Sequence, residues 1–475
     1  MADLRQLTMD CIKMLEGSGY YDRAKALPNN NTKVELLNSN DLSVWKSTYY
    51  PQLSRAGVIK DGAYFQSPVI DINYGIGADG AFTKYEYVQF LWQAYKYVLT
   101  DFSANPGITY IKECIDMLEK YTGSFQNKGT ETQKVLGLNA VDLTRWNYEF
   151  YPLFSKSGLI PDGQFFGDVN KTPNYGIGQD GAFAGEELCH FLYQLYKFAS
   201  SVIDRNIPVW KVLFFLCKNV TANSVTSRLT DEDVTDMQNA IKRFSNFIFA
   251  FSGGNVAIKI EQKTIERSLP LYDLGGNNYC VSFEEMTQEE FLQDLYNNTY
   301  DTFIAYARYN KIQTKWLGLT MPIMGIIGDK KREFCFMDAR AIENFPNVDY
   351  LKPSIKYPFP EEVAVHEFCH VLQWLFEENL KLGKLVNPDE ADKYGYKNQT
   401  PNAPIGGFYS FYADILAKKV KDPSTGAFIG VSPEMWRHTV REYNDSINNG
   451  AGARSAKSLD LEIKDFRVII RKVKE

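Results

Sequence analysis

The chain has 475 residues, of which 44% are hydrophobic and 14% aromatic, so it is long enough for two or three packed domains. Its net charge of −6 offers no basic surface for nucleic acid, and we expect no nucleic-acid partner. No run of residues approaches the ~18 consecutive apolar positions that a membrane-spanning helix needs, so no membrane span is expected either.

The amino terminus and the cysteines bear on the compartment. The first residues, Met1–Leu7, carry charge and lack the apolar run of a secretory leader, so we expect either an intracellular protein or a secreted one whose leader was removed. The seven cysteines are scattered without close pairs, which is typical of buried, reduced thiols.

A repeat occupies the first two hundred residues. The same residue types recur in the same order as Trp45, Asp61, Gly80 and Phe82, then Trp146, Asp162, Gly181 and Phe183. Each copy has the apolar spacing of an opening helix, a short aromatic-rich helix around the tryptophan and a closing helix. We therefore predict two mainly helical tandem units of about one hundred residues, 1–103 and 104–202.

The glycine-rich turn of each unit resembles a degenerate EF-hand loop. If Gly80 takes the sixth position, Asp79 and Glu86 take the fifth and twelfth, and residues 180, 181 and 187 repeat the pattern. Glycines stand at 75, 77, 176 and 178, where the first and third ligands of calcium belong, so we expect no calcium there. A glycine turn leading into a helix explains the pattern, and Thr83 with Glu86 predicts a capping box in the first unit. We expect the repeats to bind or target a ligand that the sequence does not identify.

Residues 203–475 show the mixture of predicted helices and strands that is typical of an α+β domain. A Thr-x-x-Asp cap at Thr230 predicts the start of a long helix with apolar helical spacing. Strands are predicted from apolar runs and alternation at 209–216, 256–260, 302–307, 319–327 and 333–337.

The segment His366-Glu-Phe-Cys-His370 carries the most specific signal in the chain. Two histidines four residues apart project from one face of a helix and can share one tetrahedral zinc ion, while Glu367 lies beside them to take a proton from water. Pro360 and two acids suit the first turn of that helix. Cys369 points away from the ligand face and is expected to be a packed thiol. The motif predicts a zincin metallopeptidase in which His366 and His370 bind zinc and Glu367 is the general base.

The third ligand does not follow the motif directly. The residues after His370 lack the glycine and histidine with which metzincins continue, so a later helix is expected to supply a carboxylate. The segment Gly406–Leu416 is the best candidate, with Asp414 as its acid.

These residues resemble a known family. His366–Trp374, followed by Gly406-Gly407 and Ala413-Asp414, resembles the plant basic secretory proteins, a family assigned to the zincin peptidases. The spacing also resembles that of thermolysin-like and lethal-factor-like gluzincins. The resemblance implies a glutamate ligand to zinc and, four residues later, an acid that supports a ligand histidine. It covers about fifty residues and leaves the repeats unexplained.

The chain departs from this pattern at Ser410, where those families carry the ligating glutamate. A neutral hydroxyl is a poor zinc ligand compared with a carboxylate. Three alternatives follow: Asp414 is the third ligand, or it supports His366 from behind, or the site is degraded.

Other side chains near the motif are candidates for lesser roles. His438, on a helix predicted at 433–447, can bind the metal or donate a hydrogen bond to the transition-state oxyanion. Four phenols can also donate to the oxyanion, those of Tyr394, Tyr396, Tyr409 and Tyr412. An edge strand that holds an extended peptide is expected at Phe334–Met337, or else at Leu319–Ile327.

The sequence thus predicts a zinc-dependent hydrolase of peptide bonds, with one zinc ion and a protein or peptide substrate. One alternative is a catalytically defective zincin-fold binding or structural protein in which the repeats are the working part. A zinc-dependent toxin or effector acting on one host protein is another.

Overall fold

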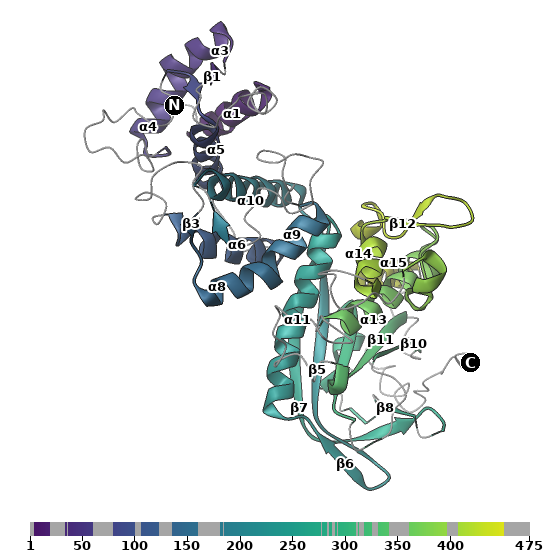
Figure 1. Cartoon of the computed structure of the whole chain (residues 1–475). Helices are drawn as coiled ribbons and strands as arrows, with labels where there is room; N and C mark the ends of the chain where they lie inside the picture. Colours follow the sequence, from purple (N-terminus) through teal and green to yellow (C-terminus); the bar gives the residue numbers. More distant parts are fainter. Residues whose placement is uncertain are drawn as a thin grey trace. The chain divides into compact units, whose positions relative to one another are not determined.

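The structure is a computed structural model that describes residues 4–19, 34–35, 37–59, 79–99, 106–122, 135–159, 181–183, 185–276, 278–282, 285–286, 290–291, 293–309, 312, 318–324, 331–341, 361–396 and 407–450. The chain divides into two compact units, Met1–Asn206 and Ile207–Glu475, each described here by itself. Helices combine with a mixed β-sheet, which agrees with a multidomain α+β fold (Figure 1). The boundaries at 103/104 and 202/203 stay predictions, and the division at 206/207 lies close to the second.

Unit 1 is mainly helical. Its elements are α1 (Leu4–Gly17), β1 (Val34–Glu35), α3 (Ser39–Val44), η1 (Trp45–Tyr49), α4 (Tyr50–Arg55), β2 (Ala81–Phe82), α5 (Lys84–Val98), α6 (Pro106–Glu119), β3 (Val135–Leu136), α8 (Ala140–Arg145), η2 (Trp146–Phe150), α9 (Tyr151–Ser157), β4 (Ala182–Phe183) and α10 (Gly185–Arg205). The order of elements from α6 to α10 matches the order from α1 to α5. The short strands pair antiparallel, β1 with β2 and β3 with β4.

A buried tryptophan lies at the centre of each half of unit 1. Trp45 packs edge-on against Phe82 and Phe90 at ring distances of 5.5 and 5.0 Å. Trp146 makes the corresponding contacts with the rings of Phe183 and Phe191. These aromatics therefore lie in the core of unit 1, together with buried aliphatic side chains.

The turn before each closing helix requires glycine. Gly80 has a φ of +81°, and a Cβ there would lie 2.2 Å from a methyl carbon of Leu42. Thr83 and Glu86 cap α5 reciprocally, so the predicted capping box is confirmed. The glycine-rich runs at 73–77 and 174–178 lie outside the described residues.

Two partly buried glutamates link the helices of unit 1. Glu16 accepts hydrogen bonds from the phenols of Tyr95 on α5 and Tyr193 on α10. Glu119 accepts from the phenol of Tyr196 on α10 and from the ammonium of Lys96 on α5. Each carboxylate thus joins a side chain of α5 to one of α10.

Unit 2 combines a mixed sheet with helices. Its elements are β5 (Val209–Ala222), β6 (Val225–Arg228), α11 (Asp231–Phe251), β7 (Ala257–Asp273), β8 (Tyr279–Val281), α12 (Gln293–Tyr296), β9 (Thr302–Ala307), β10 (Gly318–Met324), β11 (Lys331–Asp338), η4 (Ala339–Ala341), α13 (Glu362–Leu372), η5 (Gln373–Asn379), η6 (Pro388–Tyr394), α14 (Gly407–Leu416), β12 (Val420–Lys421), β13 (Phe428–Ile429), η7 (Met435–Arg437) and α15 (Val440–Gly450).

The main sheet has the strand order β10-β11-β9-β5-β7-β8 among the described residues. The strands β11, β9, β5 and β7 are parallel, and β10 and β8 run antiparallel to their neighbours. The predicted strands are therefore confirmed among the described residues, although β5 and β7 continue well beyond the expected ends. Residues 325–327 of the predicted strand 319–327 lie outside the described residues. The preferred edge strand, Phe334–Met337, is wrong because β11 pairs on both sides, and β10 is instead the terminal strand of the sheet that the described residues form.

The sheet is buried on both faces around its central strand β5, which explains the continuous apolar run of that strand. Trp210 and Phe214 point to one face, where they meet the rings of Phe368 on α13 and Phe244 on α11. Leu213 and its alternating neighbours point to the other face, into a cluster that includes Phe291 and Phe303. The long helix α11 begins at the Thr230–Asp233 capping box, as predicted.

The predicted helix at 433–447 is wrong in its first half. A single 3-10 turn, η7, ends at Arg437, and His438 is extended with a ψ of 143°. The carbonyl of His438 accepts a hydrogen bond from the indole of Trp210, which ties this break to the sheet. The helix α15 begins only at Val440.

A buried ion pair holds the start of α13. The guanidinium of Arg243 on α11 donates to both carboxylate oxygens of Glu361, at 2.7 and 3.1 Å. Glu361 precedes α13 and its side chain is fully buried. The two hydrogen bonds compensate both charges for the hydration that they lose on burial. Because the pair is held at two points, it also orients the helix that carries the His-Glu-His motif.

Replacing Arg243 with methionine is expected to destabilise unit 2 by about 3–5 kcal/mol, because Glu361 is left as an uncompensated buried charge. Urea denaturation followed by circular dichroism measures the loss. The matched control is Arg267→Met, whose partner Glu290 forms a more exposed pair, and it should cost about 1 kcal/mol or less. Equal losses in the two variants would contradict the assignment.

Candidate metal centre

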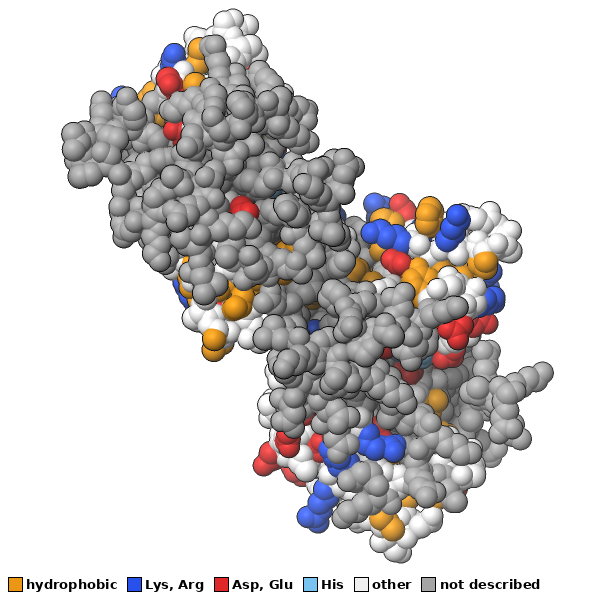
Figure 2. Space-filling model, in the orientation of Figure 1, with side chains coloured by type: hydrophobic (Ala, Val, Ile, Leu, Met, Phe, Trp, Pro, Cys, Tyr) orange, Lys and Arg blue, Asp and Glu red, His pale blue; other side chains and the backbone are white. Residues whose placement is uncertain are grey.

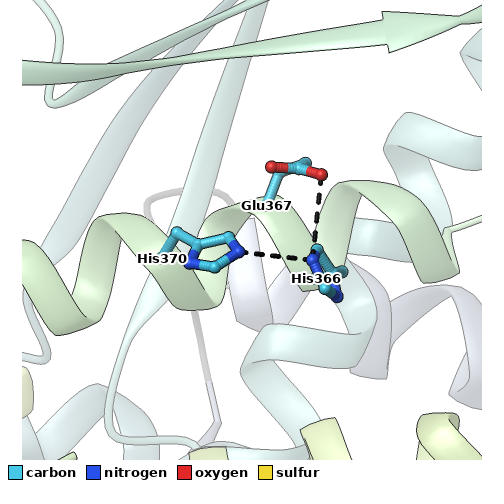
Figure 3. A group of neighbouring side chains, drawn as sticks. All are labelled: His366, Glu367 and His370. Carbon is cyan, nitrogen blue, oxygen red and sulfur yellow. Dashed lines mark hydrogen bonds and ion pairs between the residues drawn. The ribbon is translucent and has the colours of Figure 1, made fainter. Parts of the chain in front are cut away.

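Helix α13 brings two imidazoles together. His366 and His370 lie one turn apart, and their Nε2 atoms are 3.3 Å from each other (Figure 3). Their side chains are 21% and 23% exposed, whereas the opposite face of the helix, with Val365, Phe368 and Cys369, is buried. The apolar spacing of the helix therefore turns the opposite face into the core and leaves the two imidazoles partly exposed, and Cys369 is a packed thiol as predicted.

Glu367 is held by the terminal strand of the sheet. Its Oε1 atom lies 3.9 Å from His366 Nε2, and its Oε2 atom accepts a hydrogen bond of 2.5 Å from the hydroxyl of Thr320 on β10. Gly318 on the same strand leaves space for this carboxylate, because a Cβ there would lie 2.3 Å from Oε1. The side chain is only 4% exposed, so β10 fixes a nearly buried carboxylate next to the imidazoles.

Tyr412 orients His366 from behind. Its hydroxyl lies 2.8 Å from His366 Nδ1, and α14 packs against α13 at this point. If Nδ1–H donates to the phenol oxygen, Nε2 is left with its lone pair directed at His370. Burial, followed by the charge of Glu362, raises the pKa of Tyr412 well above its ordinary value, so the phenol stays neutral. From the sequence, Tyr412 was predicted only as a possible hydrogen-bond donor to the oxyanion.

Asp389, which was not predicted to be a site residue, also reaches the two histidines. Its Oδ1 lies 3.3 Å from His366 Nε2, and its Oδ2 lies 3.6 Å from His370 Nε2. It stands in the first turn of η6, where its backbone NH donates to the side chain of Asn387. No motif spacing marks this residue, because η6 is a separate segment that meets α13 only in the folded chain.

Asp414 makes a different contact. Its Oδ2 accepts a hydrogen bond of 2.6 Å from the phenol of Tyr396, and burial raises the pKa of the carboxyl while this bond opposes the rise. Among the described contacts, Asp414 has none with His366 or His370. Its role as a zinc ligand therefore stays a prediction. Ser410 lies on the same helix and is half-buried.

The remaining candidate side chains make no described contact with His366 or His370. His438 is exposed beside η7, and no described contact joins it to His366 or His370. Tyr394 stacks on Phe411, and Tyr396 is committed to Asp414. The side chain of Tyr409 is outside the described residues.

The charges at the site are coupled. Burial acts to lower the pKa of His366, but the carboxylates of Asp389 and Glu367 outweigh it and hold that pKa above its ordinary value. Hydrogen bonds from His366 and His370 hold the pKa of Asp389 far below its usual range. The pocket of negative charge around two imidazoles thus favours a cation.

The group formed by His366, Glu367 and His370 can hold a metal ion, because one donor atom from each lies within 4.8 Å of the others. A zinc ion bound to nitrogen at about 2.0–2.1 Å in tetrahedral geometry separates its donors by roughly 3.3–3.4 Å. The Nε2 atoms of the two histidines show this separation, at 3.3 Å. The two imidazole nitrogens are therefore close enough to share one metal ion.

Comparison with known proteins gives no relative. The chain matches no model of a known protein family, no curated protein and no solved structure. None of the helices in the described part of the chain has both the length and the apolar character required to cross a bilayer. On the face seen in Figure 2, acidic and basic side chains of the described residues are intermixed around unit 2.

Glu362 is expected to make the stability of the metal-free protein depend on pH. Burial and the neighbouring charge of Glu361 raise its pKa to about 7. The folded state then binds a proton that the unfolded state releases, so the free energy of unfolding falls as pH rises from about 4.5 to about 7, by up to about 3 kcal/mol.

Glu362→Gln should remove this part of the pH dependence and stabilise the protein at pH 8, as measured by urea denaturation at several pH values with a chelator present. Glu266→Gln, at an exposed position on β7, serves as the control and should leave the pH profile unchanged. A Glu362→Gln profile that follows the unmodified protein would show that the carboxyl does not titrate in this range.

Proposed function

We propose that unit 2 is a zinc-dependent metallopeptidase. The single observation that carries the proposal is the convergence of two imidazole Nε2 atoms at 3.3 Å beside a nearly buried carboxylate on the same helical turn. His366 and His370 would hold the zinc, and Glu367 would act as the general base. The fold supports this, because an α-helix with these residues packs against a mixed sheet that ends in an antiparallel strand.

Zinc, when bound, would polarise the substrate carbonyl and lower the pKa of water at the site to about 7. The protein groups would move the proton. Glu367 takes a proton from the attacking water as its oxygen bonds to the carbonyl carbon, and passes that proton to the amine nitrogen as the carbon–nitrogen bond breaks. The water is consumed, and a carboxylic acid and an amine result. Thr320 keeps Glu367 in position through both transfers.

The terminal strand β10 is the proposed binding place for an extended substrate. It pairs with β11 on one side only among the described residues, and its Gly318 and Thr320 touch Glu367. A peptide added along the other side of β10 would form main-chain hydrogen bonds next to the general base. The substrate class that follows is a peptide or protein in an extended conformation.

Unit 1 is proposed to be a tandem duplication that serves binding or targeting. Its two halves share the order of elements, and their core tryptophans and linking glutamates correspond in position. No metal-capable cluster is found in the described part of this unit. The chemistry is therefore assigned to unit 2.

Replacing Glu367 with glutamine is expected to lower peptide hydrolysis by about 100- to 10,000-fold, because the amide cannot accept the proton. Zinc should remain bound, since the histidines are intact. Cleavage of a quenched fluorescent peptide library and zinc analysis by mass spectrometry measure the two effects. Glu378→Gln, an exposed carboxylate on η5, is the control. Unchanged hydrolysis by Glu367→Gln would refute the assignment.

Replacing Thr320 with valine removes the donor to Glu367 and is expected to lower kcat by about 10- to 100-fold, the loss of one hydrogen bond to a charged group. Thr320→Ser keeps the hydroxyl and should retain most of the activity. Zinc content should be the same in both variants. A valine variant with the serine variant's kcat would show that the strand does not position the base.

A further inference from the structure

Asp389 is the third side chain that faces the space between the two imidazoles. Its two carboxylate oxygens are divided between them, with Oδ1 3.3 Å from His366 Nε2 and Oδ2 3.6 Å from His370 Nε2. We propose that Asp389 is the third protein ligand of the zinc ion, in place of the carboxylate that position 410 lacks. The inference rests on the zinc site of the proposed function, but not on its peptidase chemistry.

The separations suit one ion. The three donor groups are pairwise 3.3 to 3.6 Å apart, close to the roughly 3.3–3.4 Å edge of a tetrahedral zinc site. Two neutral imidazoles and one carboxylate are ligands that zinc accepts together, and they leave a fourth position open for chemistry. Glu367 is farther, at 3.9 Å from His366 Nε2, and Thr320 occupies one of its oxygens.

The backbone holds Asp389 in place although its side chain is 62% exposed. Leu385 and Val386 before it, and Ala391 after it, are buried. The backbone NH of Leu385 donates to the carboxylate of Glu377 on η5, which fixes the start of the segment. The helix η6 packs against both α13 and α14. The carboxylate therefore stands on an anchored turn.

The neighbouring acids on η6 have other environments. Glu390 pairs with Lys393 on the surface, and Asp392 is exposed to solvent. The described side-chain contacts of Asp389 are with the two imidazoles. Two explanations of these contacts are possible: an ion pair between Asp389 and protonated histidines, or a zinc site in which Asp389 binds the metal with neutral histidines. Only in the zinc site does removal of the Asp389 carboxylate remove a metal ligand and lower the zinc affinity strongly.

The first test measures zinc alone, with zinc-buffered solutions and the full chain. Asp389→Asn should weaken zinc affinity on the order of 100-fold or more, beyond the loss seen for groups that only support a ligand. Asp392→Asn, on the same turn, and Asp414→Asn should keep the affinity of the unmodified protein. If Asp414→Asn loses zinc and Asp389→Asn keeps it, the proposal is overturned.

A second test gives a signal only if residue 389 binds the metal. Asp389→Cys loaded with Co²⁺ should show an intense near-ultraviolet absorption from charge transfer between sulfur and cobalt, and Asp392→Cys should not. The seven native cysteines are buried and are present in both variants. Absence of the band in cobalt-loaded Asp389→Cys would refute the ligand role, even if the zinc affinity of Asp389→Asn is reduced through misfolding.

The outcomes separate this inference from the proposed function. If the protein binds zinc through Asp389 but cleaves no peptide, the ligand assignment stands and the peptidase proposal fails. If it cleaves peptides and Asp389→Asn binds zinc normally, the peptidase proposal stands and the ligand assignment fails. If the unmodified chain binds no zinc from zinc-buffered solution, both fail.

Discussion

Two imidazole nitrogens held 3.3 Å apart on one turn of α13 are the constraint on which the candidate site of unit 2 depends. Lone pairs of neutral imidazoles repel at that distance, so a proton or a metal cation must lie between them. The surroundings favour the cation, because the carboxylates of Glu367 and Asp389 approach the same space. The helix cannot relieve the repulsion easily, since its other face is packed into the core and its start is fixed by Arg243.

The sheet makes this arrangement rigid. Alternation along β5 sends Trp210 and Phe214 to the helices and Leu213 to the opposite cluster, so the sheet has a core on each face. Alternation along β10 has a second consequence. Gly318 and Thr320 point to α13, where one leaves space for Glu367 and the other donates to it, while Leu319 packs on the opposite cluster. The strand that is proposed to hold substrate therefore also holds Glu367, the proposed general base.

The supporting residues differ from those that the resemblance to basic secretory proteins and gluzincins implies. The resemblance implies an acid hydrogen-bonded to a ligand histidine, but the side chain that contacts His366 Nδ1 is the phenol of Tyr412. Asp414 accepts a hydrogen bond from Tyr396. With serine at 410, the carboxylate that reaches the histidines comes from η6. Because no family, curated protein or solved structure matches the chain, the proposed function depends on this geometry and on the motif.

The local part of the site could be predicted from sequence because helical periodicity places residues 366, 367 and 370 on neighbouring positions of one helical turn. The starts of two helices could be predicted as well, because the capping residues Thr230, Thr83 and Glu86 act on backbone groups only three residues away. Strand positions followed from apolar runs and alternation, which are also local features of the sequence. The strand order, the break at His438 and the partners Thr320, Tyr412 and Asp389 were decided by tertiary structure. These contacts join segments that are distant in the chain, and their pairing depends on how whole elements pack, which no local spacing encodes.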